Sequence, residues 1–187
     1  MSDSDFSLLV ELVGLLREAD QRPGLKAAVE IKGSGDVKSK TYLVEARVEG
    51  SSYRTVRSDD WSKFEIVYQS DTHQTLIFEA NDSPIIRDSE WRIPVATPEL
   101  AMFRPLDLPM WGGPTDTHKI ISVARSEENE FILELTMLGP DGDSDETYEV
   151  VVDSQLGYVS RMTWNYNNYT VKNLEIIGEA DIWQIEL

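Results

Sequence analysis

The chain has 187 residues, no cysteine, 34 acidic and 17 basic residues, two histidines and a formal net charge of −17. The lack of cysteine excludes disulfides, cysteine-ligated zinc, iron–sulfur clusters and a cysteine nucleophile. The acidity disfavours nucleic acid and anionic membrane surfaces as partners. Hydrophobic residues make up 41% of the chain, too many for a disordered protein. Length and composition therefore predict one globular domain over residues 1–187.

The first expected element is an amphipathic helix over residues 5–19, capped by Ser4 or Asp5 and ended by Pro23-Gly24. Its apolar stripe is broad, so we expect it to pack on two sides or to be partly covered. The acidic start lacks the basic region of a secretory signal, and the apolar run is too short to span a membrane. As written, the chain is expected in the cytoplasm; if a signal was removed, the periplasm or the extracellular space is expected instead.

After Gly24 the hydrophobic period changes from 3.6 to 2, which predicts strands. Alternating runs lie at residues 42–48, 64–68, 76–80, 131–137, 148–152 and 158–166. Turn-forming residues lie between them at 33–36, 50–52, 81–84, 139–142, 153–157 and 167–168. This spacing predicts an antiparallel meander of about nine or ten strands, and so large a sheet must curl, close or split. The expected fold is α+β, mostly β, with a curved half-barrel sheet.

Residues 94–114 interrupt the alternation with five prolines and two glycines, yet they are rich in apolar side chains. Within them, residues 98–103 are expected to form a short helix with Thr97 as N-cap and Pro98 at its first position. An apolar insertion of this length is expected to fold as a lid over the concave side of the sheet. A cavity is expected wherever the lid leaves space.

The sequence contains only weak motifs for metal binding or catalysis. Asp71-Thr-His73 and Asp116-Thr-His118 share a spacing that suits two metal ligands on one strand face, but turn formation explains them better. Residues 141–145 resemble a calcium loop, yet Glu146 stands where that loop requires glycine. The sequence contains no serine elbow and no phosphate-binding glycine loop. We therefore expect a protein that is not an enzyme and has no metal or cofactor; a hydrolase that uses carboxylates is the open alternative.

Methionine and tryptophan on a lid make an adaptable apolar surface, so a hydrophobic site is expected beneath it. Its predicted wall combines strand and lid residues: Tyr42, Val44, Phe64, Ile66, Leu133, Leu135, Met162 and Trp164 with Leu100, Met102, Phe103, Met110 and Trp111. Core packing is expected for Trp61, Trp91 and Trp183, and residues 180–187 are expected to close the sheet as an edge strand.

The layout resembles the lipoprotein-carrier fold of LolA, LolB and the amino-terminal domain of RseB. The resemblance rests on the first helix, the Arg-rich strand at residues 53–57, the lid, and residues 152–159. The last segment is similar to the family's V-D-x-x-T-G-x-P hairpin, with Leu156 and Val159 in place of threonine and proline. The resemblance implies a half-barrel that binds an acyl chain, a lipoprotein or an apolar peptide without covalent chemistry. The alternative is an acidic interaction module with a filled core that binds a basic protein partner.

Overall fold

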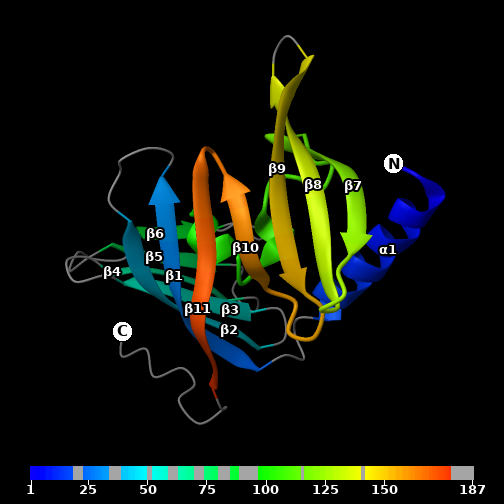
Figure 1. Ribbon diagram of the computed structural model, residues 1–187. Coiled ribbons are helices and arrows are strands. Elements are labelled where there is room, and N and C mark those ends of the chain that lie inside the picture. The colour runs from blue at the N-terminus through cyan, green and yellow to red at the C-terminus, as the bar shows by residue number, and fades with distance from the viewer. Residues whose placement is uncertain are drawn as a thin grey trace.

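The fold is seen in a computed structural model that describes residues 1–18, 23–33, 39–49, 52–58, 63–69, 74–79, 85–88, 97–114, 116–139 and 142–177. The described strands form one curved antiparallel sheet of eleven strands, one more than the upper estimate from the sequence (Figure 1). A helix and the lid lie on the concave side of this sheet, as the sequence predicts.

The helices are α1 (Asp3–Arg17) and α2 (Pro98–Ala101), and a 3-10 turn η2 (Pro105–Asp107) follows α2. The first six strands are β1 (Gly24–Gly33), β2 (Lys40–Glu49), β3 (Ser52–Ser58), β4 (Lys63–Gln69), β5 (Gln74–Glu79) and β6 (Ile85–Asp88). The last five are β7 (His118–Arg125), β8 (Glu130–Gly139), β9 (Gly142–Asp153), β10 (Val159–Trp164) and β11 (Asn167–Ile177).

The strand order explains the position of the lid. The sheet runs β6-β5-β4-β3-β2-β1-β11-β10-β9-β8-β7, so two meanders join where β1 pairs with β11. The two edge strands, β6 and β7, are therefore consecutive in the chain. Their connection must pass from one edge of the sheet to the other, and its described part, residues 97–117 without residue 115, crosses the concave side. The expected lid, residues 94–114, is described from residue 97 on, and from here the name lid covers residues 97–114 together with residues 116 and 117, which lead into β7.

Helix α1 begins earlier than the sequence predicts. Its N-cap is Ser2, whose hydroxyl accepts a hydrogen bond from the backbone N–H of Asp5 at 3.2 Å, while the Asp5 carboxylate accepts one from the backbone N–H of Ser2 at 2.6 Å. The expected caps Ser4 and Asp5 were therefore wrong: this reciprocal capping box already satisfies the first turn. The helix packs against β7 with Leu12 and Leu16 buried, and Glu11 pairs with Arg125 of β7 at 2.7 Å.

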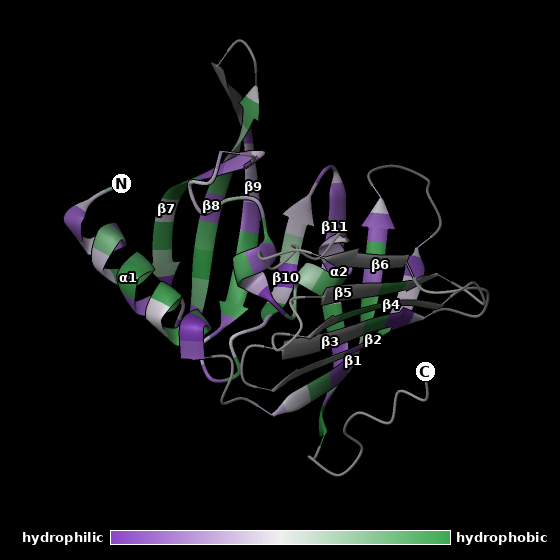
Figure 2. Cartoon of the chain, turned by 180° about the vertical axis from the view of Figure 1, so that it is seen from behind, coloured by the Kyte–Doolittle hydropathy of each residue, from purple (hydrophilic) through white to green (hydrophobic). Residues whose placement is uncertain are grey.

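The alternating pattern predicted the buried face of the sheet. Val44, Leu133 and Leu135 are fully buried, and the intervening Glu134 faces solvent. Figure 2 shows hydrophobic stretches along β7, β8 and β9 next to α1. One turn was misplaced: Asn165 and Tyr166 connect β10 to β11 with positive φ angles of 48° and 64°, and Asn167 already belongs to β11. Two consecutive residues with positive φ angles are typical of a tight hairpin turn. The turn therefore lies two residues earlier than expected.

Candidate functional site

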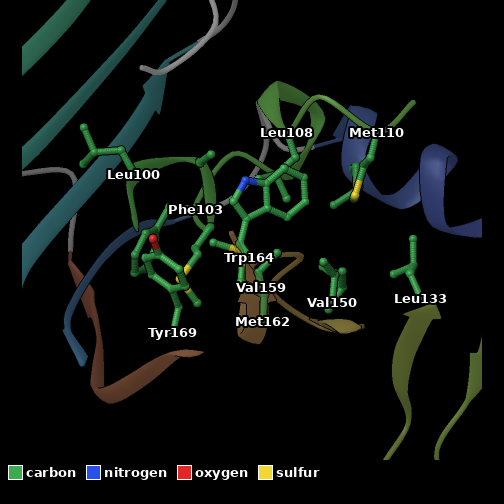
Figure 3. Close-up of a cluster of buried hydrophobic side chains, with 14 of the residues drawn as sticks. Leu100, Phe103, Leu108, Met110, Leu133, Val150, Val159, Met162, Trp164 and Tyr169 are labelled. Carbon is green, nitrogen blue, oxygen red and sulfur yellow. The ribbon is translucent and has the colours of Figure 1, made fainter. Parts of the chain in front are cut away.

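The first part of the lid is a buried anchor. We call Leu100, Ala101, Met102, Phe103 and Leu108 the anchor residues; each is at most 7% exposed. Helix α2 begins after Thr97 with Pro98 in its first turn, as predicted, although the Thr97 side chain makes no capping hydrogen bond. Figure 3 shows Leu100, Phe103 and Leu108 beside Met162, Trp164 and Tyr169 of β10 and β11. The anchor therefore completes the core of the half-barrel rather than roofing an empty space.

Polar contacts attach the anchor to the sheet. The Glu99 carboxylate, 4% exposed, accepts a hydrogen bond from the Arg57 guanidinium of β3 at 2.6 Å. The same guanidinium lies over the Tyr42 ring, 4.8 Å from its centroid. Burial, with the nearby Glu99 and Tyr42, raises the pKa of Tyr169 to about 12. These contacts hold α2 against the half of the sheet that contains β2 and β3.

A backbone hydrogen bond fixes the anchor to β10. The N–H of Val159 donates to the carbonyl oxygen of Met102 at 2.7 Å. Val159 stands where the resembled hairpin motif has proline, and proline has no N–H to donate. This departure from the motif therefore provides the anchor's hydrogen bond to β10. The rest of the hairpin keeps its turn, in which the Asp153 carboxylate accepts from the backbone N–H groups of Gln155 and Leu156 at 2.9 and 2.7 Å.

Leu106 and the residues from Trp111 onward form a more exposed rim of the lid. We call Leu106, Trp111, Gly112, Gly113 and Asp116 the rim residues. The indole N–H of Trp111 donates to the carbonyl oxygen of Pro105 at 2.8 Å. The Asp116 carboxylate accepts from the backbone N–H groups of Gly112 and Gly113 at 2.6 and 2.9 Å, and Gly112 has a φ of 94° that favours glycine. The rim is thus a loop that is held together by its own hydrogen bonds and lies next to the anchor.

A groove of about 670 Å³ lies between this rim and α1. Four elements form it: one face of α1, the rim with Met110, the first residues of β7, and the end of β8. Its lining residues are Met1, Leu9, Val13, Arg17, Leu106, Met110, Trp111, Gly112, Gly113, Asp116, His118, Lys119, Ile120 and Leu138. We call it the α1 groove. Its volume falls in the usual range for small-molecule sites, which are concave and mostly apolar.

The mouth of the α1 groove exposes large apolar side chains. Met1 is 58%, Leu106 40% and Leu138 41% exposed, although each has apolar neighbours across the groove. Exposed apolar residues that line one concavity mark interaction sites more often than isolated ones do. A ligand that fills the groove would remove this surface from water.

A second hollow of about 560 Å³ lies on the other side of the rim. It shares Leu106, Trp111, Gly113 and Asp116 with the α1 groove and reaches Trp164 and Asn165 at the end of β10. The rim therefore separates two hollows, so a small displacement of Trp111 would change the shape of both.

His118 lies at the floor between the rim and the sheet. Its ring is 1% exposed, lies 3.9 Å from the Trp164 ring by centroids, and meets the Tyr148 ring edge-on at 5.2 Å. Its Nδ1 is 2.9 Å from the Thr117 hydroxyl oxygen, whereas its buried Nε2 has no hydrogen-bond partner in the described part of the chain. Burial lowers the pKa of His118, which keeps the ring neutral near pH 7.

The predicted wall residues divide between the core and the hollows. Met110 and Trp111 line the α1 groove, and Trp111 and Trp164 line the second hollow. The buried members of the core are Val44, Ile66, Leu100, Met102, Phe103, Leu133, Leu135 and Met162, with Tyr42 packed against them at partial exposure. Met110 and Trp164 belong to this core as well, at 2% and 3% exposure, so each borders a hollow from within the core. The side chain of Phe64, and the whole of Trp61, Trp91, Trp183 and residues 180–187, lie outside the described residues. That these residues contact a ligand stays a prediction.

Several groove residues were missed by the sequence analysis. Leu9, Val13 and Arg17 follow one another at four-residue intervals, which places them on one face of α1. This spacing was a usable signal, because it distinguishes the groove face from the buried face formed by Leu12 and Leu16. Leu106 and Leu138 gave no comparable signal, since they meet α1 only through the tertiary fold.

The metal motifs do not converge in the described part of the chain, where no group of three or more potential ligands is found. Asp116 caps the rim loop and His118 packs among aromatic rings. Asp71-Thr-His73 lies outside the described residues, as do the side chains of the acidic residues at 141–145. No helix in the described ranges is long and apolar enough to cross a membrane.

No family model and no curated protein matches the sequence. Solved structures similar to the chain include PNGF-II, with 8% identity, 85% of this chain and 28% of that chain covered, and a TM-score of 0.45. The Pseudomonas aeruginosa MucA/MucB complex matches with 12% identity and a TM-score of 0.38, and the match covers 88% of this chain and 56% of that chain. A LolA superfamily protein from Nitrosomonas europaea matches with 11% identity and a TM-score of 0.38, and the match covers 89% of this chain and 94% of that chain.

The chain spans less than a third of the PNGF-II chain and just over half of the matched chain in the MucA/MucB complex. At these identities the likeness concerns the fold alone.

Proposed function

We propose that this protein is a non-enzymatic binding module that holds a hydrophobic chain in the α1 groove. The chain would be an acyl chain, free or on a lipoprotein, or an apolar peptide segment. The single observation that carries the proposal is the groove itself: an apolar concavity of about 670 Å³ whose mouth leaves Met1, Leu106 and Leu138 at least 40% exposed.

The binding energy would come from burial of hydrocarbon, about 0.8 kcal/mol for each methylene removed from water. Association and ordering of the ligand offset much of this gain, so a preformed groove binds better than one that must be opened. The anchor supports a preformed groove, because it fixes the rim to a packed core through the buried Met102 and Leu108. The predicted wall residues that line neither hollow would reach a ligand only after the anchor is displaced.

Photocrosslinking tests the location. A dodecanol analogue that carries a diazirine would label the protein saturably, and peptide mapping should place the label on residues 1–17 and 106–120. Replacing Leu106 and Leu138 together by serine should reduce labelling, whereas Leu43→Ser should not, because Leu43 is 53% exposed on β2 and does not line the groove. Labelling that cannot be saturated, or that maps to the strands β2–β5, would contradict the proposal.

A further inference from the structure

The later part of the rim, which begins at Trp111, is closed where the lid leads into β7. The backbone N–H groups of Thr117 and His118 both donate to the carbonyl oxygen of Pro109, at 3.1 and 3.2 Å. The carbonyl oxygen of Thr117 accepts in turn from the backbone N–H of Leu138 on β8 at 2.9 Å. We call these three hydrogen bonds the base of the rim. His118 is therefore part of the base through its backbone.

The side chain of His118 is packed as a neutral ring. It is 1% exposed and lies between the rings of Trp164 and Tyr148, at centroid distances of 3.9 and 5.2 Å. In the tautomer that carries its proton on Nδ1, the ring donates to the Thr117 hydroxyl, and Nε2 is an acceptor without a partner among the described residues. Protonation would give both nitrogens a hydrogen to donate. A buried imidazolium with one unpaired N–H costs more than its cation–π attraction to Trp164 returns.

The charged groups on the surrounding elements are positive or already hydrogen-bonded. The positive groups that line the same groove are the amino group of Met1, Arg17 and Lys119. Uncharged side chains lie beside His118 on β8 and β10, namely Met137 and Trp164. Of the nearby acids, Asp116 accepts from two backbone N–H groups of the rim, and Glu146 accepts from the Tyr148 hydroxyl at 2.8 Å. Burial and Glu146 raise the pKa of Tyr148, which stays neutral. The imidazolium therefore gains a second partner, from these acids or from water, only when the ring leaves this packing.

We propose that His118 is a pH-sensitive switch: its neutral ring holds the rim in place beside the α1 groove, and its protonation frees the rim and releases the ligand. This inference rests on the proposed function. When the protonated ring swings out, the backbone of His118 shifts and its hydrogen bond to Pro109 loosens, so the base of the rim opens. A hydrophobic chain held between α1 and Trp111 then loses one wall of its site.

The switch links ligand binding to proton release. Binding favours the closed rim and the closed rim favours the neutral ring, so binding releases a proton wherever the free protein holds one on His118. Affinity therefore falls as the pH is lowered through the pKa of His118 in the free protein, and it is constant above that pKa. Because burial lowers this pKa below the ordinary value of histidine, the change is expected between pH 7 and pH 5.

Isothermal titration calorimetry tests the switch with dodecanol, which carries no titratable group in this range. Between pH 7 and pH 5 its dissociation constant should rise at least about threefold, and the protons released per bound molecule should increase toward about one. His118→Gln should bind dodecanol with the same affinity at both pH values, because glutamine is not protonated. Glu45→Gln is the matched control, since Glu45 is titratable but does not line the groove; this variant should keep the pH dependence of the wild type.

Amide hydrogen exchange locates the movement in the ligand-free protein. The N–H groups of Thr117 and His118 form the base of the rim, so their protection should fall between pH 7 and pH 5 after correction for intrinsic exchange rates. The N–H of Val159, which donates to the carbonyl oxygen of Met102 in the anchor, is the internal control and should lose less protection.

The failures are distinguishable. If dodecanol binds equally well at pH 7 and pH 5, the switch is ruled out while hydrophobic binding stands. If the affinity falls just as much in His118→Gln, or if the three amides lose protection alike, the pH acts through other groups and the inference is overturned. If dodecanol binds at neither pH, the proposed function fails as well. Thermal unfolding at each pH confirms that the proteins are folded, and if His118→Gln does not fold, amide exchange of the wild type decides alone.

Discussion

The anchor and the rim are neighbours in one lid and share an apolar, proline-rich composition, but they differ in burial. The anchor residue Met102 is fully buried, whereas the rim residue Leu106 is 40% exposed. The anchor is attached to the sheet by the Arg57–Glu99 ion pair and the Val159–Met102 hydrogen bond. The rim is closed mainly on itself, through Trp111 and Asp116. The same kind of sequence thus supplies the core in one part and a candidate binding surface in the next.

The largest expected effect is on the anchor. Met102→Ala should lower the free energy of unfolding by about 2–5 kcal/mol, because it removes a fully buried side chain and leaves a cavity. Urea denaturation measures the loss. At low denaturant, where the variant is folded, dodecanol affinity should stay within about twofold of the wild type. A stability loss below about 1 kcal/mol would show that the anchor is not part of the core.

The ion pair of the anchor should matter next. Glu99→Gln leaves the Arg57 guanidinium facing a neutral partner in a mostly buried place, and should lower the free energy of unfolding by about 3 kcal/mol. Glu45→Gln is the matched control, since Glu45 pairs with Lys26 at 3.5 Å on the exposed surface and should cost at most about 1 kcal/mol. Equal losses for the two variants would contradict the role assigned to Glu99.

His118 predicts a pH dependence of stability. Burial lowers its pKa in the native protein below the value of 6.5 for an unperturbed histidine, so below about pH 6.5 the unfolded chain binds a proton that the native state does not. The free energy of unfolding should therefore be highest above pH 7 and fall as the pH is lowered from 7 toward 5.5. His118→Phe should flatten this slope. If the pH dependence of the free energy of unfolding is unchanged in the His118 variant, it arises from other titratable groups.

The mouth of the α1 groove should show the smallest effect on stability and the largest on binding. Leu106→Ser and Leu138→Ser should each change the free energy of unfolding by less than about 0.5 kcal/mol, because both side chains are already about 40% exposed. Each should nevertheless weaken dodecanol binding severalfold, as measured by calorimetry. Unchanged affinity in both variants would show that Leu106 and Leu138 do not contact the ligand.

These differences show what local sequence patterns could and could not predict. Alternation predicted the buried face at Val44, Leu133 and Leu135, because the period of a strand is a local property. The pairing of β1 with β11 has no local signal, since its partners are separated by most of the chain. The lid was predicted from its prolines and apolar residues, but its division into anchor and rim depends on contacts with α1, β8 and β10.

The candidate site was predicted in part for the same reason. Met110 and Trp111 were chosen because their residue types suit an adaptable apolar surface, and both line the α1 groove. Leu9, Leu106 and Leu138 come from three distant segments, so no single window of sequence contains the groove. The hydrogen bond between Val159 and Met102 could not be predicted from the sequence. Val159 was noticed only as a departure from the resembled motif, and its role became clear only from the position of Met102 in the fold.

Methyl-labelled NMR of the five methionines tests the central claim most directly, because the chain supplies its own controls. Met1 and Met110 line the α1 groove, Met110 as a buried residue, whereas Met102 and Met162 lie in the core and do not line the groove. On titration with dodecanol, the methyl signals of Met1 and Met110 should shift in a saturable way while those of Met102 and Met162 stay nearly constant. Shifts confined to Met102 and Met162, or no saturable shift at all, would contradict binding in the groove.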